Sequence, residues 1–361
     1  MDAKEAILFL EDGTSFTGKS SGVSAETLGE VILNTGVVGY QEMITDSANA
    51  GKILILTYPL IGNYGVNEQF NESDKAWISG LVIKEASSIY SNWQAKASLE
   101  DFLKQQNILV ITEVDTRTLA VKIRNDGEML GIISCGEANP KDLLKKITEF
   151  KEKKKESVLP RVSVKEITKI SGQGKRIVII DLGIQRSTLR QLASLGFEVV
   201  LVPYATGAGE ILKLKPQGLI ISNGPEHDPE LPKVAKNIKE LLGEIPILGI
   251  SCGHQVIALA LGAKITKMKL GHHGLNYPVK SEDSLKGEIT VQNHSFVVEE
   301  KSLNQKEIKI AEKNINDQTV EKMKSEKLKF ISVQYYPLSP GLNEIHPVFG
   351  EFIEMMGNSK S

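Results

Sequence analysis

Residues 246–262 (PILGISCGHQVIALALG) read as an apolar strand, a sharp turn with a glycine on each side, and an apolar helix. Such a turn presents one side chain at the carboxyl end of a strand, and small residues two positions before and after it permit the bend. Gly249 and Gly253 hold these two positions around Ser251. We therefore expect Ser251 at the outward position, with Cys252 one residue too late to occupy it.

The rest of the second half alternates between strands and helices. Apolar runs at 176–181 (RIVIID) and 198–203 (EVVLVP) flank a helical pattern over 185–195, and the apolar run GLIIS follows. This alternation predicts an α/β fold with a doubly wound parallel sheet. Ligands of such sheets gather at the carboxyl ends of the strands, so we expect site residues in the loops after the strands.

The first half has a different pattern. Short apolar runs at 6–10 (AILFL), 52–59 (KILILTYP) and 80–85 (GLVIKE) are separated by Gly, Asn and Asp turns. Helical spacing is visible only near 99–106 and 117–124. These features predict a strand-rich α+β domain.

A change of composition separates the two halves. The charged run FKEKKK at 150–155 is followed by a polar, β-branched stretch that ends near Lys175. We interpret residues 151–175 as a linker between a first domain at 1–150 and a second domain at 176–361. The charge run itself is typical of a solvated helix end.

Composition narrows the classes of partner. The net charge is −2, which gives no electrostatic reason to expect nucleic acid or a membrane surface. The chain has 2 cysteines, its N-terminus lacks the order of a signal peptide, and no apolar run reaches the ~20 residues of a membrane span. We expect a cytoplasmic protein.

Several many-residue motifs of the second half, which we expect in loops, resemble the class I glutamine amidotransferase domain: SNGPEHDP, GISCGHQ, KMKLGHHGLNYPV, QNHSF and VQYYPLSPG. Motifs of the first half, NTGVVGYQEMITD, LTYPLIGNYG and DTRTLAVKIRNDG, are similar to the amino-terminal domain of the carbamoyl phosphate synthetase small subunit. The resemblance covers nearly the whole chain, in the order of that family.

The resemblance implies a function and a partner. In this family the small subunit hydrolyses glutamine and passes ammonia to a large subunit, which makes carbamoyl phosphate for arginine and pyrimidine biosynthesis from bicarbonate and ATP. We therefore expect a heterodimer with a large subunit. We expect no cofactor in this chain, and ATP and Mg in the large subunit.

The family's catalytic triad is altered in this chain. The family uses a Cys nucleophile, a His base and a Glu that orients the His, because a thiol needs a neighbouring base to remove its proton. Aligning the Gly-x-Cys-x-Gly turn puts Ser251 at the nucleophile and Cys252 at the oxyanion-hole position. The Gln-Gly-His-Pro-Glu motif puts Tyr336 at the base and Leu338 at the orienter. Tyrosine, with a reference pKa of about 10, is a poor proton acceptor at neutral pH.

The glutamine-binding residues implied by the resemblance are also partly replaced. Changed positions are Ala48 for a serine, Glu226 in SNGPEHDP where the family has glycine, and Ser295 for a glycine in QNHSF. The retained or neighbouring positions are Gly224, Cys252, Gln255, Asn293 and Phe296. Weak glutamine binding is therefore the most that this set predicts.

These changes lead to one main hypothesis and two alternatives. The main hypothesis is a pseudo-glutaminase that keeps its association with the large subunit. The first alternative is an active glutaminase that works through Cys252 or Ser251, with His227 or His254 as a substitute base. The second is a free-standing module that binds another metabolite.

The remaining histidines have structural interpretations. His272 and His273 lack a third well-spaced ligand, so no metal site is expected. His254 and His294 are expected to be hydrogen-bonded scaffold residues, with His294 in a loop, and His346 is expected at the surface.

Overall fold

The structure is a computed structural model, and it describes residues 4–21, 26–136, 138–153, 156–281, 283, 287–304, 306–341 and 344–357. The chain forms two compact units. The first contains residues 1–156 together with 269–273, and the second contains residues 157–268 and 274–361.

The first unit is built around a closed barrel with the strand order β1-β2-β8-β6-β4-β3-β9. Strands β3, β4, β6 and β8 pair in parallel, and β1, β2 and β9 close the barrel by antiparallel pairing. The strands are β1 (Lys4–Leu10), β2 (Ser15–Ser21), β3 (Glu26–Asn34), β4 (Ile53–Leu56), β6 (Gly80–Val82), β8 (Leu109–Thr112) and β9 (Leu130–Cys135); β5 (Leu60–Ile61) pairs with β7 (Glu85–Ala86) outside it.

Alternation along the strands divides the core of the first unit. In β4, Ile53 and Ile55 pack in one cluster with α3, whereas Leu54 and Leu56 pack in another with α1 and α2. Helix α4 covers β1 and β9 in a third cluster. The helices are α1 (Tyr40–Thr45), α2 (Leu99–Gln105), α3 (Thr116–Asp126) and α4 (Pro140–Lys153), with single 3-10 turns at η1 (Ser47–Asn49) and η2 (Glu68–Phe70).

The second unit contains a mixed sheet with the strand order β10-β12-β11-β13-β14-β19-β18-β17-β15-β16. The stretch from β12 to β19 is parallel, and β10, β18 and β17 extend it by antiparallel pairing. The strands are β10 (Thr168–Ile170), β11 (Arg176–Asp181), β12 (Glu198–Pro203), β13 (Gly218–Ile221), β14 (Ile247–Ile250), β15 (Ile265–Ser281), β16 (Gly287–Val298), β17 (Lys309–Asn314), β18 (Val320–Ser325) and β19 (Phe330–Val333).

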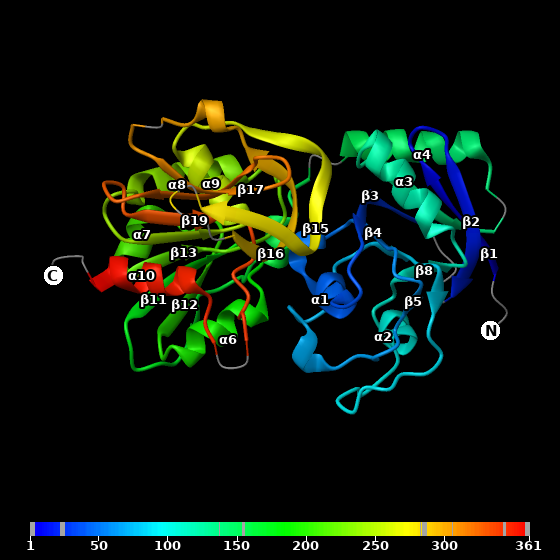
Figure 1. Cartoon of the computed structure of the whole chain (residues 1–361), viewed down its shortest axis with the longest axis horizontal. Coiled ribbons are helices and arrows are strands. Elements are labelled where there is room, and N and C mark those ends of the chain that lie inside the picture. Colours follow the sequence, from blue (N-terminus) through cyan, green and yellow to red (C-terminus); the bar gives the residue numbers. More distant parts are fainter. Residues whose placement is uncertain are drawn as a thin grey trace. The chain divides into compact units, whose positions relative to one another are not determined.

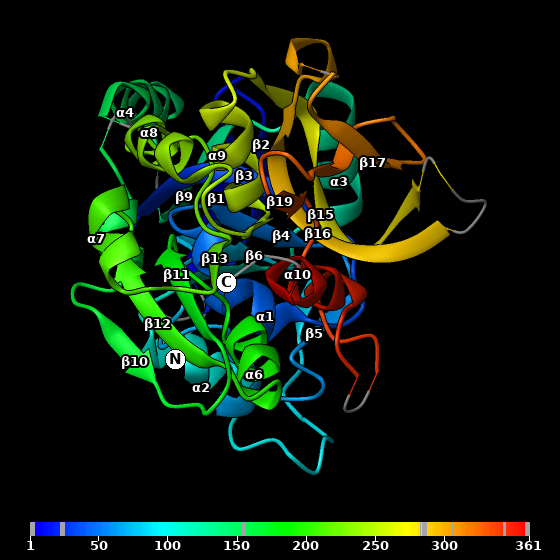
Figure 2. The same ribbon diagram turned by 90° about the vertical axis from the view of Figure 1, so that its left-hand side faces the viewer.

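Helices cover both faces of the parallel part of this sheet (Figure 1). Helices α5, α7, α8 and α9 contribute to one apolar cluster, and α6 and α10 contribute to the cluster on the opposite face, as Figure 2 shows from a second side. They are α5 (Leu159–Val162), α6 (Arg186–Ser194), α7 (Ala208–Lys213), α8 (Leu231–Leu241), α9 (Cys252–Ala260) and α10 (Pro347–Gly357), with a 3-10 turn at η3 (Glu300–Ser302).

The predicted fold class is confirmed: a strand-rich first unit precedes a doubly wound α/β unit. One expectation about its loops is wrong, because KMKLGHHGLNYPV and QNHSF lie within the long strands β15 and β16. His294 is therefore a strand residue. Their mixed polar and apolar sequence hides the strands, since these strands bury only part of their length.

The segment predicted as a linker contains helix α5 and strand β10, and both belong to the second unit.

Every helix in the described part of the chain is too short or too polar to cross a lipid bilayer.

Candidate functional site

The predicted turn is present between β14 and α9, and Ser251 is its corner residue. Its backbone has φ 52° and ψ −107°, a conformation that residues other than glycine rarely adopt. The Ser251 N–H donates to the carbonyl of Val333 at 2.7 Å, which ties the corner to the end of β19. The strained turn is therefore present around a serine, whose side chain is buried in this structure.

The glycines at this end of the sheet are required by close packing. A Cβ atom on Gly253 would lie 2.1 Å from the carbonyl oxygen of Ile221. A Cβ on Gly224 would lie 2.0 Å from the carbonyl oxygen of Leu182. Both positions admit only glycine, which agrees with the alignment that places Ser251 at the corner.

The Ser251 hydroxyl is isolated. The residue is fully buried, and in the described part of the second unit no group hydrogen-bonds its Oγ. No imidazole of that unit is therefore positioned to remove its proton. A serine hydroxyl without a base is a very weak nucleophile at neutral pH.

The thiol of Cys252 lies in the apolar core of the second unit. Its Sγ donates to the carbonyl of Pro225 at 3.4 Å, and the residue belongs to the apolar cluster beneath α8 and α9. Burial, and then the negative charges of Glu226 and Asp228, raise the pKa of this thiol well above its ordinary value. The thiolate that would react is thus disfavoured.

His254 lies in the first turn of α9 and is also fully buried. Its Nδ1 lies 2.9 Å from Ser332 Oγ, and its Nε2 has no hydrogen-bond partner among the described residues. Burial lowers the pKa of His254 to about 3, so the ring is neutral at physiological pH. It is held as a scaffold residue by the end of β19.

The two other triad positions carry groups with structural contacts. Tyr336 is buried, pairs with Val291 of β16, and its phenol oxygen accepts from Asn293 Nδ2 at 3.3 Å. Leu338 packs against the apolar cluster shared by α6 and α10. The neighbouring Tyr335 donates its hydroxyl to Glu312 Oε2 at 2.9 Å.

Four of the predicted glutamine-binding residues meet around one carboxylate, and we call Glu226, Gln255, Ser295 and Phe296 the Glu226 cluster. Glu226 Oε1 accepts from Gln255 Nε2 at 2.5 Å and from the Phe296 N–H at 3.3 Å. Its Oε2 accepts from the Ser295 N–H at 2.7 Å. Sequence reasoning named these residues but did not reveal this arrangement, because nothing in the sequence indicates which donors a side chain meets.

Two further residues named from the sequence lie outside the Glu226 cluster: His227 follows Glu226 in the chain, and Ala48 belongs to the first unit. His227, with φ 55°, stacks on Phe296 with ring centroids 4.9 Å apart and planes at 7°. Ala48 is buried in η1 of the first unit, and its N–H donates to Asp46 Oδ1.

Three histidines outside the turn have polar partners within hydrogen-bonding distance. His346 was expected at the surface, but it is 5 % exposed, because it begins the segment that packs α10 on the sheet, and it lies 3.1 Å from Glu288 Oε1. His294 lies 3.0 Å from Gln292 Oε1 and 3.1 Å from the Phe296 carbonyl. His273 lies 3.0 Å from Glu128 Oε1, and both side chains are fully buried.

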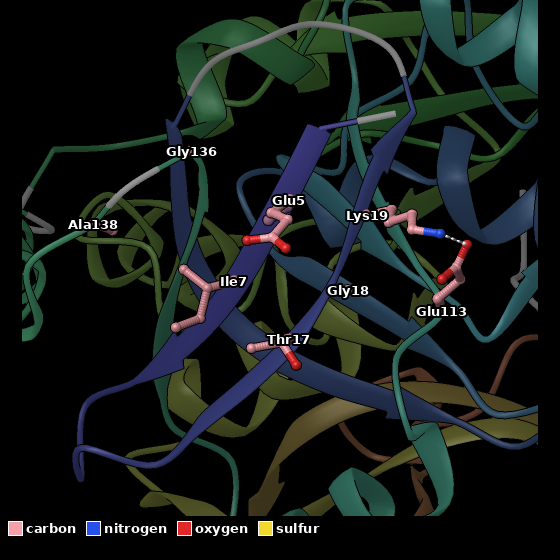
Figure 3. Close-up of a pocket in the computed structure, with 9 residues that line it drawn as sticks. Glu5, Ile7, Thr17, Gly18, Lys19, Glu113, Gly136 and Ala138 are labelled. Carbon is pink, nitrogen blue, oxygen red and sulfur yellow. Dashed lines mark hydrogen bonds and ion pairs between the residues drawn. The ribbon is translucent and has the colours of Figure 1, made fainter. Parts of the chain in front are cut away.

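The first unit has a hollow of about 450 Å³ beside β1 and β2, shown in Figure 3. Its polar lining includes Glu5, Thr17 and the exposed ion pair between Lys19 and Glu113. None of these residues belongs to the predicted site, and the exposed ion pair does not define a ligand.

Comparisons with known proteins agree with both halves of the structure. The family model "Carbamoyl-phosphate synthase small chain, CPSase domain" matches residues 8–133, and "Glutamine amidotransferase class-I" matches residues 178–355. The chain is 40% identical over 360 residues to the carbamoyl phosphate synthase small chain of Listeria monocytogenes serotype 4b, covering 98% of this chain and 97% of that protein.

Two other relatives show the same extent of similarity. The small chain of Aquifex aeolicus is 41% identical over 98% of this chain and 99% of its own length. The carbamoyl phosphate synthase pyrimidine-specific small chain of Bacillus subtilis is 40% identical over 97% of this chain and 95% of its own length. With this identity over nearly its whole length, the chain belongs to the carbamoyl phosphate synthase small chain family.

Proposed function

We propose that this chain is a carbamoyl phosphate synthase small subunit that no longer hydrolyses glutamine at a useful rate. It would associate with a large synthetase subunit that uses free ammonia. The observation that carries this proposal is the isolated Ser251 hydroxyl, which has no hydrogen-bond partner in the described part of the second unit.

The chemistry at the triad positions supports the loss of activity. Hydrolysis through a covalent intermediate needs a nucleophile, a base that takes its proton and a group that orients the base. Tyr336 offers a phenol and Leu338 an alkyl chain at the last two positions. Removing the nucleophile or the base of a triad alone can cost about 10⁶ in turnover, so losing all three roles leaves negligible catalysis.

Cys252 does not rescue the reaction in this proposal. Its raised thiol pKa and its hydrogen bond to Pro225 favour the neutral, inward-facing thiol. His254 cannot activate it efficiently as a charged partner, because its own pKa is lowered to about 3. An active glutaminase working through Cys252 would lose glutamate release in a Cys252→Ala variant, whereas a pseudo-glutaminase shows the same background in both proteins.

The expected partner and cofactors follow from the family. The large subunit would hold ATP and Mg, and this chain would need no cofactor of its own. The carbamoyl phosphate formed would serve pyrimidine synthesis, as the name of the Bacillus subtilis relative says of that protein, and also arginine synthesis. We place the assembly in the cytoplasm.

The direct test is the release of glutamate from glutamine by the purified complex, followed by mass spectrometry. We expect glutamate only at background while carbamoyl phosphate forms from ammonium. Glutamate release at a rate comparable with carbamoyl phosphate synthesis would refute the proposal. Failure of the chain to co-purify with its large subunit would favour a free-standing binding module.

A further inference from the structure

The Glu226 cluster brings three hydrogen-bond donors of the second unit to one carboxylate. Two backbone N–H groups of consecutive residues in β16, at Ser295 and Phe296, point to the two oxygens of one carboxylate. The side-chain amide of Gln255, from α9, adds a third donor. Donors that converge in this way on a negative charge form short, strong hydrogen bonds.

The donors come from rigid elements, and the acceptor comes from a loop. Gln255 is 1 % exposed and Ser295 is 1 % exposed, and both lie in elements that pack in the core of the second unit. Glu226 is half-buried in the loop between β13 and α8, next to His227 with its positive φ. The donors would therefore keep their positions if the Glu226 side chain were absent.

A further amide lies beside the cluster. Gln334 Oε1 is 3.3 Å from Gln255 Nε2, and Gln334 is fully buried. Its Nε2 has no hydrogen-bond partner among the described residues. A buried donor without an acceptor is costly, and it indicates a position where a polar ligand atom could bind.

We infer that Glu226 is an internal ligand: its carboxylate occupies the position at which this unit would otherwise bind the carboxylate of a free amino acid. The ligand class is a small α-amino acid, with L-glutamine as the probe. Because the tethered carboxylate needs no association from solution, it outcompetes a free one at ordinary concentrations. Glu226 thus excludes the free amino acid, and this effect does not depend on the absence of a base at the position of Tyr336.

This inference rests on the proposed function, since it explains why a chain that does not hydrolyse glutamine also does not retain it. The two ideas can fail separately. A measurement of glutamine binding tests the role of the Glu226 cluster alone. A measurement of glutamate release tests the triad positions alone.

The test is isothermal titration calorimetry of L-glutamine with the full chain and its Glu226→Gly and Glu226→Ala variants. We expect both variants to bind glutamine at least about tenfold more tightly than the wild type, because removing the Glu226 carboxylate leaves its three hydrogen-bond donors to the carboxylate of the ligand. Circular dichroism and thermal melting establish that each variant is folded. Glu226→Ala keeps the test valid if the glycine variant does not fold.

Two controls separate the carboxylate from the loop around it. His227→Ala disturbs the same loop but keeps the Glu226 carboxylate, so it should bind glutamine no more tightly than the wild type. L-Glutaminamide, which lacks the α-carboxylate, should gain no affinity from either Glu226 substitution. The inference is overturned if folded Glu226 variants bind glutamine as weakly as the wild type, if His227→Ala gives the same gain, or if glutaminamide gains equally.

Discussion

At the scale of single residues, Ser251 combines a strained corner conformation with a hydroxyl that lacks a hydrogen-bond partner in the described part of its unit. Its corner geometry, with φ 52°, costs about 1–3 kcal/mol and persists because the glycines and the end of β19 hold it. The hydroxyl nevertheless has no base within the described part of its unit. The strain therefore has a structural origin in the packing of the turn and does not by itself indicate activity.

A Ser251→Cys substitution tests whether the corner alone suffices. We expect glutamate release to remain at background, because a thiol at this corner still lacks an imidazole base and its orienting carboxylate. Glutamate release is measured on the complex, with Cys252→Ala as the matched thiol control. If the Ser251→Cys protein released glutamate as fast as the complex makes carbamoyl phosphate, this expectation would be contradicted.

The buried imidazole of His254 predicts a pH dependence of stability. Its pKa is lowered to about 3 by burial, against about 6.5 in an unfolded chain. As the pH falls below about 6.5, the unfolded chain binds a proton that the folded chain does not, so this contribution to stability is lost progressively towards pH 3.

Urea unfolding at several pH values measures this effect. The unfolding free energy of the wild type, relative to a His254→Gln variant, should decrease by roughly 1 kcal/mol for each pH unit between about pH 6 and pH 4. Parallel pH profiles of the two proteins would show that His254 does not titrate in this way.

Residue-level prediction succeeded where local sequence determines geometry. The register around Ser251 followed from glycine spacing, because only glycine fits at Gly253. The contacts of Glu226 could not be predicted, since they join a loop, a helix and a strand that are distant in sequence. His346 was predicted wrongly because a histidine near a chain end carries no local signal of burial.

At the scale of elements, the antiparallel part of the large sheet depends on a buried ionic group. Lys322 of β18 lies 3.3 Å from Glu312 of β17 and 2.5 Å from Glu351 of α10, with 7% of its side chain exposed. Burial opposes its charge, but the two carboxylates outweigh burial and raise the pKa of Lys322. This group links β17, β18 and α10.

A Lys322→Met substitution should destabilise the second unit by about 3 kcal/mol, because it leaves the Glu312 carboxylate largely buried without its cation. The matched control is Lys233→Met, whose ion pair with Glu230 lies on the surface and should contribute little to stability. Urea unfolding of both variants gives the comparison. Equal losses of unfolding free energy in the two variants would contradict a special role for Lys322.

Prediction at the element scale depended on how uniformly an element is buried. Strands β11 and β12 were predicted with the bounds that the structure has, because parallel strands covered on both faces are continuous apolar runs. Strands β15 and β16 were interpreted as loops, because their polar residues and glycines resemble turns. Their partners in the sheet are distant in sequence, so local pattern could not identify them.

At the scale of the whole molecule, the family assignment implies glutamine hydrolysis, whereas the residues at the expected triad positions do not fit that reaction. Both family models match, and the relatives align over nearly the entire chain. Because the chain keeps both units but carries Ser251, Tyr336 and Leu338 at the positions expected for the triad, our proposal gives it an assembly role. The partner would then receive its ammonia from solution.

Reconstitution with the cognate large subunit tests this account most directly, with carbamoyl phosphate measured from glutamine and from ammonium salts side by side. We predict synthesis from ammonium and only background synthesis from glutamine at equal nitrogen concentration. Synthesis from glutamine that matches or exceeds synthesis from ammonium would contradict the account.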